Sequence, residues 1–163
     1  MPSSSLTIEQ VLTLLAETPP RLAALTAGLA PAQLRIAPNQ GEWSANDVLA
    51  HLRSCGDVWG DCIRAIIAED GPTLRAVDPR TWIKGANYHE LDFRPSLEAF
   101  TAQRAELLAV LERLPPDGWS RAATVTGAGK PLERTVLSYA QRLVRHERPH
   151  LKQVARIVDA IRA

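Results

Sequence analysis

Three of the four histidines lie where their side chains could bind one metal ion. His146 and His150 belong to the segment "VRHERPHLKQ" and satisfy the pattern H-E-x-x-H. On a helix this pattern places two imidazoles one turn apart, as in zinc proteases. His51 lies in a separate segment, "EWSANDVLAHL". Neutral imidazoles bind zinc at about 2.0–2.1 Å, and three protein ligands leave a coordination position open for water or a substrate.

The residues after the H-E-x-x-H pattern exclude a zinc protease. Such proteases take their third ligand downstream of the pattern. After His150 the chain has neither histidine nor glutamate, and its one acidic side chain is Asp159. Nine helical steps place Asp159 about half a turn out of phase with His150. Pro149 also removes a backbone hydrogen bond from the helix. The third ligand is therefore expected upstream, and His51 is the candidate.

Apolar periodicity directs all three histidines toward a protein interior. His146 and His150 fill the gap in a helical stripe made of Val136, Tyr139, Leu143, Val154, Ile157 and Ile161. His51 falls on a second stripe, which includes Val48, Leu52, Cys55 and Ile66. A single histidine on such a stripe is usually an ordinary core residue. Three that converge need hydrogen-bond partners or a cation, and a divalent cation satisfies all of them.

Four amphipathic helices are expected to position these residues. Their predicted starts are Thr7, Ser44, Ser96 and Thr135. Thr7 and Gln10 form a capping-box pattern, and Pro19-Pro20 should kink or split the first helix. Only the stretch "ATVTGAG" has the pattern of a strand.

These elements predict an all-α protein, a four-helix bundle that forms a single domain over residues 1–163. The connection between the second and third helices, residues 71–95, is long for a bundle and contains Trp82, Tyr88 and His89. Connections of this length are functional or disordered. The aromatic residues favour an ordered one.

Composition bounds the partners. The chain has 19 basic and 18 acidic residues, a balance that argues against nucleic acid as the main partner. No apolar run is long enough to span a bilayer and no secretory signal is visible, so we expect a cytoplasmic protein. Cys55 and Cys62 are too far apart on one helix to form a disulfide.

The ordered set of motifs resembles the DinB/YfiT-like superfamily. "EWSANDVLAHL" is similar to its second helix, and "RTVLSYAQRLVRHERPHLKQVARI" is similar to its last helix. "AFTAQRAELLAVLERLPPDGWSR" is similar to its third helix and the tryptophan that follows. The resemblance covers nearly the whole chain.

This resemblance implies a four-helix bundle with a divalent metal, zinc or nickel, held by His51, His146 and His150. It also implies a homodimer. Characterised members include metal-dependent S-transferases that use a low-molecular-weight thiol such as bacillithiol or mycothiol, so a thiol co-substrate is expected. The superfamily's name does not imply DNA binding.

Four further residues are candidates for the site. Glu147 could act as a base, or it could pair with Arg148 or Lys152. Arg142 and Arg145 could attract an anionic thiol or substrate, or they could be solvated. Cys55 lies four residues after His51 on the same helix face. It could be a fourth metal ligand, or it could be a small core residue.

Three functions remain open. The first is a thiol S-transferase that acts on a small molecule, in which the metal lowers the pKa of a bound thiol. The second is a hydrolase that activates water at the same site. The third is a non-catalytic, stress-related binding or scaffold protein in which the metal only stabilises the fold.

Overall fold

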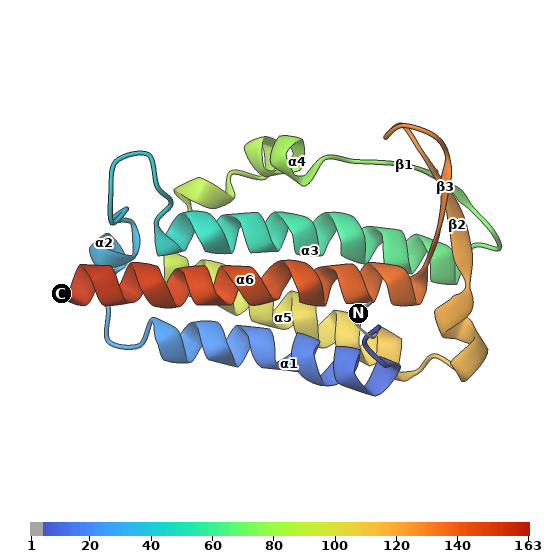
Figure 1. Cartoon of the computed structure of the whole chain (residues 1–163), viewed down its shortest axis with the longest axis horizontal. Helices are drawn as coiled ribbons and strands as arrows, with labels where there is room; N and C mark the ends of the chain where they lie inside the picture. The colour runs from blue at the N-terminus through green and yellow to red at the C-terminus, as the bar shows by residue number, and fades with distance from the viewer. Residues whose placement is uncertain (1–4) are drawn as a thin grey trace.

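The computed structural model describes residues 5–163 and confirms the predicted four-helix bundle (Figure 1). The long helices are α1 (Ile8–Leu25), α3 (Ala45–Ala68), α5 (Phe93–Glu112) and α6 (Val136–Arg162). Helix α6 packs on α3 and on α1, and α5 packs on the same two helices from the other side. None of the helices in the described range combines the length and apolar character needed to cross a membrane.

Short elements complete the fold. They are α2 (Pro31–Leu34), α4 (Pro79–Ala86), two 3-10 helices (Tyr88–Glu90 and Pro116–Ser120), and the strands β1 (Thr73–Arg75), β2 (Ala122–Thr126) and β3 (Leu132–Thr135). Strand β2 is central, parallel to β1 and antiparallel to β3. It occupies the stretch predicted as a strand. The sheet stands at one end of the bundle, where α6 begins (Figure 1).

The predicted caps fix where three helices begin. Thr7, Ser44 and Thr135 each accept a hydrogen bond from the backbone N–H three residues later, and each forms a reciprocal capping box. Such boxes satisfy two of the otherwise unpaired amides at a helix start. The start of α3 matters most for function because it sets the register of His51.

Two helices differ from the sequence prediction at prolines. Of the kink or split predicted at Pro19-Pro20, the split was wrong, because helix α1 runs unbroken from Ile8 to Leu25. Pro19 leaves the Leu15 carbonyl without its helical donor, and Arg104 Nη1 donates to that carbonyl at 2.9 Å. Helix α5 begins at Phe93 rather than Ser96. Pro95 lies in its first turn, where a missing amide leaves no hydrogen bond unmade.

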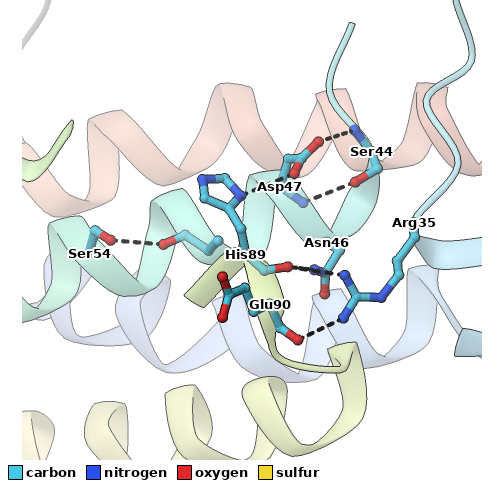
Figure 2. A network of polar contacts seen from close by, with 8 residues as sticks. Arg35, Ser44, Asn46, Asp47, Ser54, His89 and Glu90 are labelled. Carbon is cyan, nitrogen blue, oxygen red and sulfur yellow. Dashed lines mark hydrogen bonds and ion pairs between the residues drawn. The ribbon is translucent and has the colours of Figure 1, made fainter. Parts of the chain in front are cut away.

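Residues 71–95 form an ordered cover over α3 that includes β1, α4 and a 3-10 helix. The Asp57 carboxylate on α3 accepts hydrogen bonds from Trp82 Nε1 at 3.0 Å, from the Tyr88 hydroxyl and from Gln103. Figure 2 shows the second anchor, where Arg35 and Asn46 donate to the His89 carbonyl. Asp57 and Asn46 both belong to α3, so this helix holds the segment at two separate places.

Two buried apolar clusters fill the bundle, and a layer of polar residues separates them. One cluster lies toward the sheet and contains Leu15, Cys55, Leu107 and Val144; the other contains Leu22, Leu52, Phe100 and Leu151. Along α1, α5 and α6, the residues between the two clusters include Thr18, Arg104, His146, Glu147 and His150. On α3, His51 directly precedes Leu52 of the second cluster. We call this set the polar layer.

Candidate metal centre

The three histidine rings predicted to converge lie together in the groove between α3 and α6. The ring centroids are 4.7 Å apart for His51 and His146, 4.6 Å for His146 and His150, and 5.0 Å for His51 and His150. Each ring is half-buried. One turn of α6 separates His146 from His150, and the neighbouring turn of α3 presents His51 to both.

The facing nitrogen atoms have the spacing of a ligand set. His51 Nε2 and His146 Nε2 are 2.8 Å apart. Cys55 Sγ lies 3.9 Å from the first nitrogen and 3.7 Å from the second. Nitrogens bound to one ion at about 2.1 Å lie about 3.0 to 3.4 Å apart in right-angled or tetrahedral geometry. A small separation of the rings therefore suffices to place a divalent cation between them.

Cys55 joins the tightest group of candidate ligands. Among the described residues, the ligand atoms of His51, Cys55 and His146 lie within 4.8 Å of one another, and His150, the third histidine predicted as a ligand, is not part of this group. Burial, followed by the charge of Glu147, raises the pKa of the Cys55 thiol to about 12. The thiol is neutral at physiological pH unless a cation displaces its proton.

A glutamine orients His150. His150 Nδ1 is 2.8 Å from Gln153 Oε1. An amide oxygen only accepts, so Nδ1 carries the proton and Nε2 keeps a free lone pair. Outer partners of this kind fix the tautomer of metal-binding histidines. The sequence pattern assigned Gln153 no role, although its spacing of three residues from His150 on one helix was a usable signal.

Burial favours the neutral form of two of the imidazoles, His51 and His146. Burial lowers the pKa of His146 to about 3, and the charges of His150, His51 and Arg142 act in the same direction. Burial also lowers the pKa of His51. His146 Nδ1 is buried and has no hydrogen-bond partner among the described residues. Neutral imidazole is the form that binds metals, so these residues fit a divalent cation.

Two tryptophans cover the rings. Trp43 stacks on His150 at 6.1 Å between centroids and meets the His51 ring edge-on at 5.2 Å. Trp59 lies edge-on to His146 at 5.1 Å. Trp43 is 40% exposed whereas Trp59 is 8% exposed. The Trp43 indole therefore borders solvent, and the buried Trp59 indole covers the His146 ring from within the protein.

Two cavities lie near the histidine cluster, and only the first is lined by one of its histidines. The first, of about 590 Å³, is lined by His150, Trp43, Gln153 and Arg156 among others. The second, of about 420 Å³, lies toward the sheet and is lined by Trp59, Tyr139 and Arg142 among others. Of the two arginines predicted to attract an anion, Arg142 lines a cavity. Arg145 is exposed and lines neither of these two.

Glu147 points away from the imidazoles into the bundle. It is 1% exposed, and its Oε1 accepts from Thr18 at 2.8 Å and from Arg104 Nη1 at 2.9 Å. Arg104 Nη2 donates to Oε2, which completes a buried bidentate pair. The predicted pairing of Glu147 with Arg148 or Lys152 on the same helix was therefore wrong. No pattern on α6 could reveal a partner on α5.

Comparison with known proteins identifies the superfamily. Fold and site define a helical bundle with a candidate metal centre. Residues 14–154 match the family model described as the DinB superfamily, and the chain belongs to that superfamily.

Relatives and a solved structure agree with this assignment. A Geobacillus kaustophilus protein named "Putative metal-dependent hydrolase" is 28% identical over 145 residues, 84% of this chain and 76% of that protein. One of the same name from Geobacillus thermodenitrificans is 26% identical over 128 residues, 75% of this chain and 68% of that protein. The solved structure of YfiT from Bacillus subtilis, described as "a probable metal-dependent hydrolase with an unusual four-helix bundle topology", has the same fold. Its TM-score is 0.79 at 19% identity, with 96% of this chain and 90% of that chain covered.

The buried pair generates a stability prediction. Glu147→Ala leaves the Arg104 charge buried and unpaired, so we expect a loss of about 3–5 kcal/mol in the free energy of unfolding, measured by urea denaturation. Replacing both residues by methionine should recover most of that loss, because it removes the unpaired charge. Glu106 is exposed on α5, and Glu106→Ala serves as the control, with a change of about 0.5 kcal/mol or less. A Glu147→Ala loss no larger than the control's would contradict the assignment.

Proposed function

We propose that this chain is a divalent-metal-dependent enzyme in which His51, His146 and His150 hold the cation. We further propose that it transfers a low-molecular-weight thiol to a small electrophile. One observation carries the proposal: three half-buried imidazoles converge in one groove beside a cavity that His150 lines, and burial lowers the pKa of His51 and His146. Zinc and nickel both suit imidazole ligands.

The residues of the chain divide the work. A bound divalent cation supplies Lewis acidity, which lowers the pKa of a thiol or water molecule that reaches it. Gln153 accepts a hydrogen bond from His150 Nδ1, which leaves Nε2 of the neutral ring available to the cation. Trp43 and Trp59 limit the access of water to the rings. The two cavities give separate space for a thiol and for an electrophile.

The position of Glu147, the acidic residue that follows His146 in the sequence, favours thiol transfer over hydrolysis. Hydrolases commonly use a side-chain base to take a proton from the attacking water. Glu147 is bound to Arg104 and Thr18, so we assign it a positioning role rather than proton transfer. A thiol is acidic enough to lose its proton at a metal without such a base. In the transfer, sulfur bonds to the electrophilic carbon, the leaving group takes the electron pair of the broken bond, and the thiol proton passes to solvent.

A metal-dependent hydrolase is the second candidate. It is supported by the names of the two Geobacillus relatives and the description of YfiT. A non-catalytic scaffold would require Cys55 to close the site as a fourth protein ligand. A small-molecule substrate is supported by the cavity volumes of about 590 and 420 Å³. A homodimer belongs to the same proposal and is supported by the resemblance to the superfamily. A location in the cytoplasm belongs to it too and is supported by the two unpaired cysteines, Cys55 and Cys62, which suit a reducing compartment.

Metal content tests the ligand set. Protein purified without a histidine tag should hold about one zinc or nickel per chain by elemental analysis. His51→Ala, His146→Ala and His150→Ala should each lose most of it, and Gln153→Ala should weaken affinity about 10–100-fold. His89→Ala is the control, because His89 pairs with Asp47 outside the cluster, and it should keep its metal. Full metal content in His51→Ala would remove that residue from the proposed site.

Activity separates transferase, hydrolase and scaffold. Metal-loaded protein is mixed with bacillithiol or mycothiol and monobromobimane, and the thioether is quantified by mass spectrometry. We expect formation at least about tenfold above the uncatalysed rate, within the range of metal and proximity effects, with loss in His150→Ala and retention in Cys55→Ser. Hydrolysis of ester substrates without thioether formation would support the hydrolase. Neither activity, with metal lost in Cys55→Ser, would support the scaffold.

A further inference from the structure

The cavity between the histidine cluster and the sheet has walls from three parts of the chain. Helix α3 contributes Val58, Trp59 and Cys62, helix α6 contributes Tyr139 and Arg142, and the strands and the segment before α4 supply the rest, including Val125, Leu132, Arg134 and Asp78. Its volume of about 420 Å³ lies in the range of small-molecule sites, about 300–1,000 Å³. The walls are apolar apart from the charged groups.

Two guanidinium groups at this cavity have no acidic partner. Neither Arg134 nor Arg142 takes part in the ion pairs or side-chain hydrogen bonds found in residues 5–163. The third arginine, Arg80, is paired with Asp78 at 3.1 Å. The local charge is therefore positive, and its uncompensated part comes from Arg134 and Arg142.

Aromatic rings hold both groups in place. Arg142 Cζ lies 4.7 Å from the centroid of Trp59, and Arg134 Cζ lies 6.0 Å from that of Tyr139. Stacking occupies the face of a guanidinium and leaves its N–H edge free to bind an anion. The arginines are thus held at the cavity by contacts that do not use their hydrogen-bond donors.

The two positive charges act at the same place. Burial raises the pKa of Cys62 and of Tyr139, and Arg134 and Arg142 both oppose this rise at each residue. The geometry agrees, because both arginines line this one cavity and Arg134 lies over the ring of Tyr139, which is three residues before Arg142 on the same helix.

We propose that this cavity binds the anionic group of a small organic molecule, a carboxylate or a phosphate, between Arg134 and Arg142. The apolar part of the ligand packs against Val58, Val125 and Leu132. Trp59 forms the wall shared with the histidine cluster, because its ring meets both Arg142 and His146. For the proposed enzyme, this site makes the substrate a small organic anion. That assignment rests on the proposed function, whereas the binding of an anion in this cavity requires no metal.

Binding to the metal-free protein tests this site without reference to activity. Benzoate and benzamide have nearly the same shape but differ in charge, and their dissociation constants can be measured by following tryptophan indole N–H signals in NMR titrations. We expect benzoate to bind at least about tenfold more tightly than benzamide, since charge-assisted hydrogen bonds contribute about 1.5–3 kcal/mol. The Trp59 signal should shift most. Phenyl phosphate in a parallel titration shows which anion is preferred.

Variants locate the anion. Arg142→Gln and Arg134→Gln should each weaken benzoate binding at least about fivefold and leave benzamide unchanged. Arg148→Gln is the matched control, because Arg148 is exposed on the same helix and lines neither cavity. Circular dichroism establishes that each variant is folded. Equal affinity for benzoate and benzamide, or equal losses in Arg142→Gln and Arg148→Gln, would overturn the proposal whether or not the protein binds a metal.

Discussion

The structure depends on the need to satisfy polar side chains buried between two apolar clusters. All four long helices contribute to the polar layer, and each buried polar group there must find a partner or lose free energy. Arg104, Glu147 and Thr18 satisfy one another and the carbonyl left free by Pro19. The imidazoles are satisfied only in part: His51 Nε2 lies 2.8 Å from His146 Nε2 and His150 Nδ1 contacts Gln153, but His146 Nδ1 has no partner among the described residues. This difference separates the structural half of the layer from the half available to a metal.

Helix α6 connects the two halves. Adjacent residues on a helix point about 100° apart, so Glu147 faces α1 and α5 while His146 faces α3. The bidentate contact with Arg104 fixes the rotation of α6, and the Thr135 cap fixes where the helix begins. The imidazoles therefore meet His51 as a consequence of how the bundle is held together. Pro149 is accommodated within an unbroken α6.

Local patterns in the sequence predicted much of this arrangement. Two kinds of local signal were enough to predict that His51, His146 and His150 lie in one groove. They are the caps at Ser44 and Thr135 and the apolar stripes on two helices. Contacts between distant residues were not predictable. Arg104 lies on α5, and only the folded bundle shows that it meets Glu147 and supports α1 at Pro19. The covering segment 71–95 likewise depends on Asp57, whose partners Trp82, Tyr88 and Gln103 come from two other parts of the chain. The sequence of one helix does not show which residues on the other helices will contact it.

The central claim is that imidazoles from α3 and α6 bind one divalent cation. Crystals of tag-free protein grown with zinc, with anomalous diffraction data recorded on both sides of the zinc absorption edge, test it most directly. The account predicts one strong anomalous peak about 2.0–2.1 Å from the Nε2 atoms of His51, His146 and His150. A peak elsewhere, or zinc bound by His51, Cys55 and His146 with the His150 ring turned away, would contradict the proposed site.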